Sequence, residues 1–289
     1  MKKYLYYPGC SLEGTAKEYD LSTRAFLGAL GLELKELDDW TCCGATAAQS
    51  VSRLLGLALP ARNLALAESQ GPGLDLLVPC SACYLNLKSA SEKAREAPSV
   101  LGEINAVLAE AGLRMEGSVR VRHLLDVLSR DVGAENLEPK VQTPLKGLKI
   151  APYYGCQCLR PYPVFDDPEA PVTMEPLLRA AGAEVFPWDM GARCCGASHM
   201  TTKPEVGIEL VADLLEAASG ADAAVTVCPM CQLNLEAYQE TASRARGKDL
   251  SLPVLYLPQL LGLAIGLSAR DVRLDLNLTD TGSFKMLAA

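Results

Sequence analysis

Two short stretches of the sequence decide its organisation, LYYPGC at residues 5–10 and APYYGC at residues 151–156. Each is an apolar run rich in strand-forming residues that ends in glycine and cysteine. Two further motifs recur after them in the same order, CCGA at 42–45 and 194–197, then CYLNL at 83–87 and CQLNL at 231–235. The chain therefore contains an internal repeat.

The period of this repeat identifies its kind. Corresponding cysteines are 146 to 152 residues apart, far more than the periods of about 20–50 residues found in solenoids. The pattern predicts two copies of one domain, which we place at residues 1–140 and 141–289. We expect the boundary between the two domains to lie in the polar, proline-bearing stretch 131–146.

Strand and helix patterns alternate along both halves. Short runs of strand-forming residues end just before cysteines, at 4–7, 74–78, 149–154 and 223–227. Helical patterns lie between them, at 16–30, 46–69, 81–94, 174–181, 203–218 and 230–242. In the second of these helices, we expect an interruption or kink at Pro60.

This alternation implies parallel sheets, whose carboxyl ends are where ligands gather. We predict an α/β fold of two pseudo-symmetric repeats, each with a mainly parallel sheet flanked by helices. The cysteines are expected to cluster at the carboxyl ends of the strands.

The overall composition excludes several classes of protein. Of the 289 residues, 49% are apolar and 21% are charged, which is typical of a globular chain. The net charge of −8 argues against non-specific nucleic-acid binding, which needs surplus cations. The longest apolar stretch, 255–267, contains Pro258 and Gln259 and is shorter than the roughly 18 residues of a membrane span. With no signal-type segment at the start, we expect a cytoplasmic protein.

Cysteine is the unusual residue, with 11 present against two histidines. In a long chain with an odd number of cysteines and no export signal, metal or redox chemistry is a better explanation than disulfides. Ten of the cysteines form two sets of five, each with a lone cysteine, a Cys-Cys-Gly and a Cys-x-x-Cys. The first set is Cys10, Cys42, Cys43, Cys80 and Cys83, and the second is Cys156, Cys194, Cys195, Cys228 and Cys231.

Five thiolates exceed the four ligands of a tetrahedral zinc ion. The adjacent side chains of a Cys-Cys pair diverge, which suits a polynuclear iron–sulfur centre better than a single ion. Glycine after each pair fits backbone that passes close to inorganic sulfide or adopts positive φ. Two alternatives stay open, which are buried structural thiols and zinc in one repeat with an iron–sulfur centre in the other.

The duplicated cysteine pattern resembles the cysteine-rich, CCG-domain family, and the two-copy chain looks like the B subunit of heterodisulfide reductase. The resemblance covers residues 3–267. Single CCG repeats also occur in lactate- and glycolate-oxidising, glycerol-3-phosphate and fumarate-reducing enzymes, so the resemblance defines the family better than the substrate.

The resemblance implies two [4Fe-4S] clusters of the non-cubane type, each bound by the five cysteines of one repeat. By resemblance to the B subunit of heterodisulfide reductase, these clusters would cleave a disulfide held between them, and the chain would be the catalytic part of an oxidoreductase that acts on sulfur groups. It also implies two partners, one a ferredoxin-like iron–sulfur subunit and the other a flavin-bearing subunit.

Residues near the cysteines are candidates for further roles. His199 could donate a proton to a departing thiolate or be a polar residue at the start of a helix. Cys158 lacks a counterpart in the first repeat and is expected to be a spare buried thiol rather than a ligand. His123 is expected at the surface or in packing, while Arg160 and Arg193 could bind an anionic substrate, offset cluster charge or be solvated.

The sequence also lacks other redox motifs. There is no C-x₂-C-x₂-C-x₃-C run for an ordinary ferredoxin cluster, no G-x-G-x-x-G after a strand and no P-loop. Electrons must therefore arrive from another protein. Two other functions stay open, an electron-relay subunit without substrate and the iron–sulfur subunit of an organic-acid or quinone-linked dehydrogenase.

Overall fold

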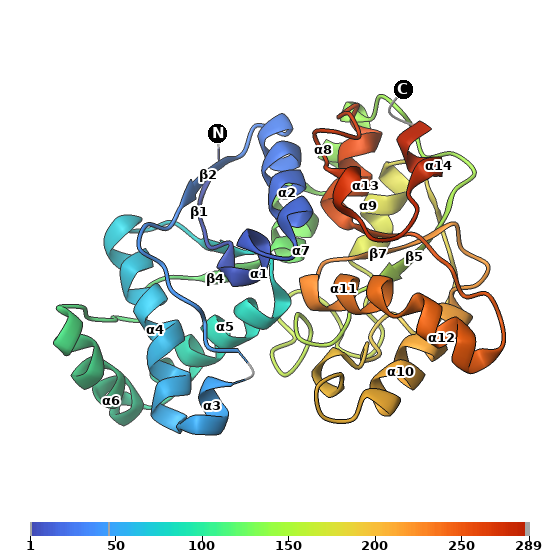
Figure 1. Ribbon diagram of the computed structural model, residues 1–289. Helices are drawn as coiled ribbons and strands as arrows, with labels where there is room; N and C mark the ends of the chain where they lie inside the picture. The colour runs from blue at the N-terminus through green and yellow to red at the C-terminus, as the bar shows by residue number, and fades with distance from the viewer. Residues whose placement is uncertain (1, 46, 287–289) are drawn as a thin grey trace.

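The computed structural model describes residues 2–45 and 47–286, and it shows an α/β protein with two parallel sheets (Figure 1). The strand order is β2-β1-β3-β4 in the first sheet and β6-β5-β7-β8 in the second, so the two halves share one topology. The predicted fold class of two pseudo-symmetric α/β repeats is confirmed. The strands within these residues are β1 (Lys3–Tyr6), β2 (Glu33–Glu36), β3 (Leu76–Val78), β4 (Val121–His123), β5 (Lys149–Tyr153), β6 (Glu184–Val185), β7 (Ala223–Thr226) and β8 (Val254–Tyr256).

The inner strands are buried, as a parallel sheet between helices requires. In β1, Tyr4, Leu5 and Tyr6 have no exposed surface, and the strand pairs with β2 on one side and β3 on the other. The edge strand β2 reads ELKE and is largely half-buried. Its polar composition explains why the sequence pattern did not predict a strand there.

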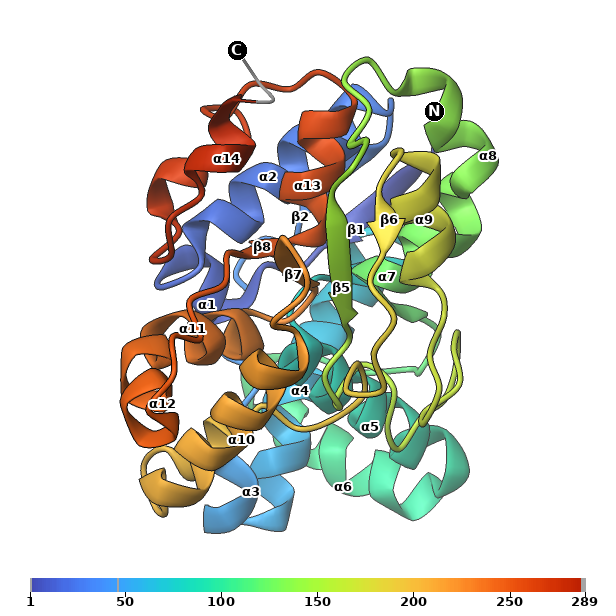
Figure 2. The ribbon, with the colours of Figure 1, turned by 90° about the vertical axis from the view of Figure 1, so that its right-hand side faces the viewer.

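Helices flank both sheets (Figures 1 and 2). Within residues 2–45 and 47–286, no helix combines the length and apolar character that a bilayer crossing needs. The helices are α1 (Gly9–Glu13), α2 (Lys17–Ala29), α3 (Ala48–Val51), α4 (Arg53–Gln70), α5 (Ser81–Glu96), α6 (Pro98–Leu108), α7 (Leu124–Val127), α8 (Ala134–Leu137), α9 (Met174–Ala180), α10 (Pro204–Ala217), α11 (Pro229–Ala237), α12 (Gln239–Arg246), α13 (Leu257–Ala264) and α14 (Gly282–Lys285).

The predicted helix at 46–69, whose first residue lies outside the described residues, is interrupted at a different place than expected. The break is at Ser52, which is extended (φ −157°, ψ 134°) and whose hydroxyl accepts a hydrogen bond from the Leu55 N–H. Ser52 therefore caps a new helix, α4. Pro60 lies buried inside α4, so the prediction of an interruption there was wrong.

The predicted helix at 230–242 is also two helices, because the chain turns at Tyr238 between α11 and α12. The first residue of α12, Gln239, exchanges two hydrogen bonds with the backbone of Leu252, at 2.7 and 3.0 Å. These bonds tie the start of α12 to the segment that leads into β8.

The two repeats pack through α2 and α13, which lie side by side in both views (Figures 1 and 2). One hydrophobic core continues across this contact, with Phe26 and Leu27 of α2 and Leu260 and Leu261 of α13 all buried in it. The chain between β4 and β5 contains the stretch in which we place the domain boundary, and that boundary stays a prediction.

Candidate functional site

The first five cysteines gather beyond the carboxyl ends of three neighbouring strands. Cys10 follows β1 in α1, Cys42 and Cys43 follow β2, and Cys80 and Cys83 follow β3 at the start of α5. The Sγ atoms of Cys43 and Cys83 are 3.3 Å apart. Hydrogen bonds also join Cys10 to Cys42 and Cys80 to Cys83, so these thiols lie together at one rim.

The second five cysteines repeat this arrangement. Cys156 follows β5, Cys194 and Cys195 follow β6, and Cys228 and Cys231 follow β7 at the start of α11. Hydrogen bonds join Cys156 to Cys194, Cys195 to Cys231 and Cys228 to Cys231. These are the counterparts of the pairs in the first group. The two groups differ in exposure, because Cys10 and Cys42 are exposed while Cys156 and Cys194 are half-buried.

Glycine is required at two kinds of position beside the cysteines. The glycines of both Cys-Cys-Gly motifs have positive φ, +75° at Gly44 and +79° at Gly196, as the sequence suggested. Gly9 and Gly155 precede the lone cysteines, also with positive φ. A Cβ atom at Gly9 would lie 2.8 Å from Sγ of Cys83, and one at Gly155 would meet the second group in the same way. The backbone therefore approaches the thiols too closely for a side chain.

A buried tyrosine in each repeat holds the segment that leads into the Cys-Cys pair. The Tyr7 hydroxyl donates to the carbonyl oxygen of Thr41 at 2.7 Å, and the Tyr153 hydroxyl donates to that of Arg193 at 2.8 Å. Thr41 and Arg193 each immediately precede a Cys-Cys pair. These tyrosines are packing residues with a positioning role.

An asparagine holds each Cys-Cys pair from the other side. Asn86 Nδ2 donates to the carbonyl oxygen of Cys43 at 3.1 Å, and Asn234 Nδ2 donates to that of Cys195 at 2.6 Å. Both asparagines belong to the repeated motif after the Cys-x-x-Cys, but their role could not be read from the sequence. Each Cys-Cys pair is thus fixed to the helix that bears the Cys-x-x-Cys.

Each group holds at least one thiol that gives up its proton easily, and in the second group the hydrogen bond from Cys231 also lowers the pKa of Cys228, to about 7. The hydrogen bond from Cys156, strengthened by the Gly196 N–H at 3.4 Å, lowers the pKa of Cys194 to about 5. The hydrogen bond from Cys83 lowers the pKa of Cys43 to about 7. The donors Cys156 and Cys83 have raised pKa values because their neighbours hold the charge. Thiolate, the form that binds metals, is therefore available near neutral pH.

The positions of His199 and Arg160 limit their roles. His199 ends a short turn after the second Cys-Cys-Gly, and it and Arg160 both contribute to the low pKa of Cys194. Arg160 is held by Glu169 at 2.8 Å and by the Ala192 carbonyl at 2.6 Å. Its guanidinium therefore has protein partners. The role of His199 as a proton donor stays a prediction.

A cavity of about 80 Å³ lies among the second five cysteines. Its wall includes all five of them, together with residues from both repeats. The remaining lining residues are Ser81, Ala82, Tyr154, Gln157, Ala197, Ser198 and Met230. The second group thus surrounds a space into which the first repeat projects the start of α5.

The donor set fits an iron–sulfur centre. Five soft thiol ligands converge on each rim, and the backbone beside them carries glycines that leave room at the sulfur atoms. Within the described residues, no three or more His, Cys, Asp or Glu side chains are arranged as a site for one metal ion. The assignment of the ten cysteines as cluster ligands stays a prediction.

Cys158 lies apart from this arrangement. It is only 1% exposed, its thiol donates to the Tyr154 carbonyl at 3.3 Å, and it is not among the residues that line the cavity. Burial raises its pKa, so the thiol stays protonated. These are the properties expected of a spare buried thiol.

The segments that lead into the two Cys-x-x-Cys motifs lie close together at the contact between the repeats. The Tyr19 hydroxyl donates to the carbonyl oxygens of Pro79, at 3.2 Å, and Val227, at 3.1 Å, which are the residues before Cys80 and Cys228. Ser81 and His123 extend this set of hydrogen bonds, because Ser81 Oγ lies 3.2 Å from both the Val227 carbonyl oxygen and His123 Nε2. We call these five residues the inter-repeat network.

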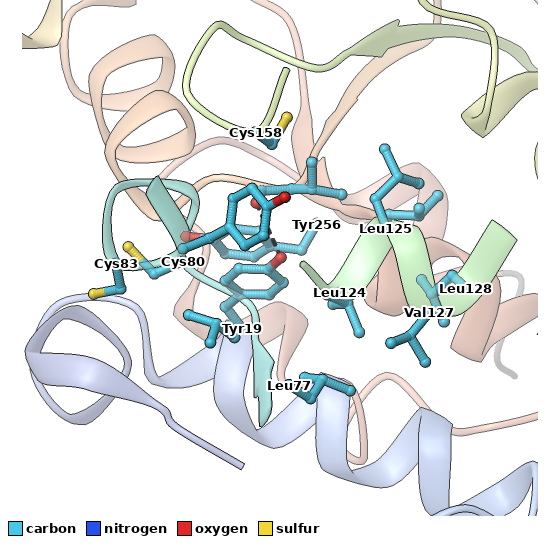
Figure 3. Packing of buried hydrophobic residues seen from close by; sticks show 14 of the residues in the cluster. Tyr19, Leu77, Cys80, Cys83, Leu124, Leu125, Val127, Leu128, Cys158 and Tyr256 are labelled. Atoms are coloured by element: carbon cyan, nitrogen blue, oxygen red, sulfur yellow. Dashed lines mark hydrogen bonds between the residues drawn. The ribbon is translucent and has the colours of Figure 1, made fainter. Parts of the chain in front are cut away.

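Figure 3 shows part of this region, with Tyr19 and Tyr256 between the Cys80–Cys83 segment and α7. The two rings are stacked at 4.0 Å. We expected His123 either at the surface or in packing, and it is fully buried, so the second expectation is confirmed. The sequence carried no signal for the network, because its partners are up to 208 residues apart.

Comparison with a known domain family gives two matches in this chain. Residues 4–88 and residues 150–236 each match the family described as a cysteine-rich domain, CCG. The first match contains the first five cysteines and the second match contains the second five. The duplication predicted from the cysteine pattern is therefore confirmed.

Relatives of this chain are named as subunits of reductases. It is 37% identical to the 8-methylmenaquinol:fumarate reductase membrane anchor subunit of Wolinella succinogenes, over 96% of this chain and 98% of that protein. It is 33% identical to a protein of Archaeoglobus profundus named as similar to the B subunit of heterodisulfide reductase, over 94% and 93%. It is 31% identical to the B subunit of the ferredoxin/F420H2-dependent CoB-CoM heterodisulfide reductase of Methanosarcina acetivorans, over 96% and 94%.

Among solved structures, a hypothetical protein from Helicobacter pylori has the same fold, with a TM-score of 0.77 at 18% identity. The match covers 98% of this chain and 53% of that one, so this chain spans about half the length of that protein. Since both halves match one domain family and relatives above 30% identity span nearly the whole chain, this chain belongs to the CCG cysteine-rich domain family.

Proposed function

We propose that the chain is the disulfide-reducing subunit of a heterodisulfide reductase-like complex, with one iron–sulfur centre in each repeat acting on the same substrate. The observation that carries the proposal is the close approach of the two segments that lead into the Cys-x-x-Cys motifs. One hydroxyl, that of Tyr19, reaches the residue before Cys80 and the residue before Cys228. The relatives named for the B subunit of heterodisulfide reductase support the same function.

The cofactors in this proposal are two [4Fe-4S] clusters of the non-cubane type. Cys10, Cys42, Cys43, Cys80 and Cys83 would hold one, and Cys156, Cys194, Cys195, Cys228 and Cys231 the other. When bound, such clusters supply single electrons at potentials set by their surroundings.

The chain's own residues hold the backbone of the Cys-Cys pairs in place and supply protons. Tyr7 and Asn86 hold the first Cys-Cys pair from two sides, and Tyr153 and Asn234 hold the second. Reductive cleavage of one disulfide takes up two electrons and two protons and yields two thiols. His199, whose charge acts on Cys194, is the residue we propose to deliver a proton on the side of the second repeat.

The proposed partners follow from the absence of other redox motifs in the sequence. Electrons would come from a ferredoxin-like subunit, itself reduced by a flavin-bearing subunit, in a cytoplasmic complex. The named relatives are subunits of larger reductases, which supports an assembly of several different chains.

The test is disulfide turnover by the anaerobically prepared protein, with reduced methyl viologen as the donor and cystine and glutathione disulfide as probes. Cys43→Ser in the first group and Cys195→Ser in the second are matched variants. Each alone should abolish turnover, while Cys158→Ser should preserve it. Half the activity in either single variant would show two independent sites and overturn the proposal.

A second function is favoured by the 37% identical relative that is named as a fumarate reductase subunit. In this alternative, the chain relays electrons within an organic-acid or quinone-linked reductase and binds no disulfide. The described cavity is lined by cysteines of the second group only, which also favours this alternative.

The same preparation separates the two functions. A relay subunit would be reduced by viologen and reoxidised by a quinone analogue, without turnover of any disulfide. A disulfide reductase would consume disulfide, with two electrons used for each molecule cleaved.

A further inference from the structure

A continuous route of short contacts joins the two cysteine groups through the inter-repeat network. The carbonyl of Pro79 belongs to the peptide bond that leads into Cys80, in the first group. The carbonyl of Val227 belongs to the peptide bond that leads into Cys228, in the second. The Tyr19 hydroxyl oxygen lies 3.2 Å from the first carbonyl oxygen and 3.1 Å from the second. Between the two cysteines, this route runs through peptide bonds except for the two contacts of one hydroxyl.

A second route runs through Ser81, the residue after Cys80. The Nδ1 atom of His123 accepts a hydrogen bond from the Leu125 N–H at 3.2 Å, so a neutral ring carries its proton on Nε2. This Nε2–H faces Ser81 Oγ at 3.2 Å and donates to it. The hydroxyl proton of Ser81 is then left for the Val227 carbonyl oxygen, which lies 3.2 Å from Oγ. Both routes therefore meet at the carbonyl of Val227.

The side chains that form these routes are excluded from solvent. Tyr19 and His123 have no exposed surface, and Ser81 is only 1% exposed. Tyr19 belongs to α2 of the first repeat, yet its ring stacks at 4.0 Å on Tyr256, which ends β8 of the second repeat (Figure 3). Hydrogen bonds and ring packing thus hold the network in one arrangement between the two cysteine groups.

The proposed function requires an electron to cross between the repeats. Cleavage of one disulfide takes two electrons, whereas iron–sulfur centres supply them singly. If a donor subunit docks on one repeat, an electron for the far centre must pass through the near one. Electron tunnelling decays least along covalent bonds, more across a hydrogen bond and most across a gap, because bonded electron density slows the decay of the wavefunction. The two hydroxyl routes offer the electron bonded and hydrogen-bonded atoms.

We propose that electrons pass between the two centres through the inter-repeat network, by way of the hydroxyls of Tyr19 and Ser81. The inference rests on the proposed function, because it requires a redox centre on each cysteine group. In each transfer, one electron leaves the centre of one repeat, which is oxidised, and enters the centre of the other, which is reduced. No bond is broken, and no proton moves.

The test is the magnetic exchange coupling between the two centres. It is measured by electron paramagnetic resonance at two microwave frequencies, in the form of the protein in which both centres are paramagnetic. Exchange coupling depends on the same orbital overlap as tunnelling, whereas dipolar coupling depends on distance and orientation. Cys43→Ser and Cys195→Ser proteins, each with one centre, give the uncoupled reference spectra. The wild-type protein should show an exchange coupling that the sum of these spectra lacks.

Two substitutions remove the routes one at a time. Tyr19→Phe and Ser81→Ala should each lower the exchange coupling, and the double variant should lower it several-fold, with the dipolar coupling unchanged. After photoreduction by one electron per chain, rapid-freeze spectra should show that redistribution between the centres slows in the same order. Tyr162→Phe and Ser89→Ala are matched controls outside the network, and both should behave as the wild type.

The outcomes distinguish this inference from the proposed function. If the wild-type protein contains no iron, the proposed function fails and the inference fails with it. If both centres are present but show no exchange coupling, or if the double variant keeps the wild-type coupling and redistribution rate, the inference alone is wrong. A changed dipolar coupling or a loss of iron in the double variant would also overturn it, because the hydroxyls would then act on the placement of the centres.

Discussion

Removal of one hydroxyl, by Tyr19→Phe, tests how the two repeats are joined. The hydroxyl is buried and donates to two carbonyl oxygens, those of Pro79 and Val227. Phenylalanine keeps the ring stacked on Tyr256 at 4.0 Å and leaves no cavity. Val227 keeps its hydrogen bond from Ser81, so the main loss falls on Pro79. We expect a decrease of about 1–2 kcal/mol in the free energy of unfolding.

The assay is urea unfolding of the anaerobically prepared protein, followed by circular dichroism and fluorescence. Tyr162→Phe is the control, since its hydroxyl takes no part in the inter-repeat network. Tyr19→Leu should cost more than Tyr19→Phe, because it also removes the ring contact. A Tyr19→Phe protein as stable as the control would refute the role assigned to this hydroxyl.

Three other predictions concern charge and close packing. Burial lowers the pKa of His123 to about 4 in the folded protein, so between about pH 6.5 and 4 the unfolded chain binds a proton there and the folded protein does not. About 3 kcal/mol of stability should therefore be lost as the pH falls through this range. Urea unfolding of the wild-type protein and of His123→Gln checks the difference. Burial raises the pKa of Glu18 to about 7, so the folded protein binds the extra proton and stability falls as the pH rises from 4.5 through 7. Glu18→Gln should therefore stabilise the protein by about 1–3 kcal/mol at pH 8 and little at pH 4.5, and equal effects at both would contradict this. Gly9→Ala should reduce the iron content of the first group, because the new Cβ atom would meet the Cys83 thiol. The control is Gly112→Ala, at a positive φ in open space, which should lower the free energy of unfolding by about 1–2 kcal/mol without loss of iron. Metal analysis and urea unfolding measure the two effects.

The part of the fold that follows from local sequence could be predicted. Buried strands such as β1 and β7 are mostly apolar, and the cysteines that follow them mark the carboxyl ends of the sheets. The edge strand β2 is polar and gave no such signal. The break at Ser52 did have one, since serine is a common helix cap, but Pro60 was the stronger signal, and the interruption expected there was wrong.

Some residues of the candidate site could also be predicted from local sequence, and others could not. The two sets of cysteines were visible because each motif is short and occurs twice. Tyr19, Ser81 and His123 were not, because hydrogen bonds between residues 42 to 208 positions apart leave no pattern in the sequence. His123 looked unremarkable because it lies outside both cysteine motifs, although it contacts the serine beside Cys80.

Metal analysis of the anaerobically purified protein tests the central claim most directly. Each five-cysteine group should hold one four-iron centre, so we predict about eight irons and negligible zinc in each chain. Cys43→Ser and Cys195→Ser should each lower the count to about four. Two zinc ions with negligible iron, or loss of all iron when one group is changed, would contradict the claim that the repeats carry separate iron–sulfur centres.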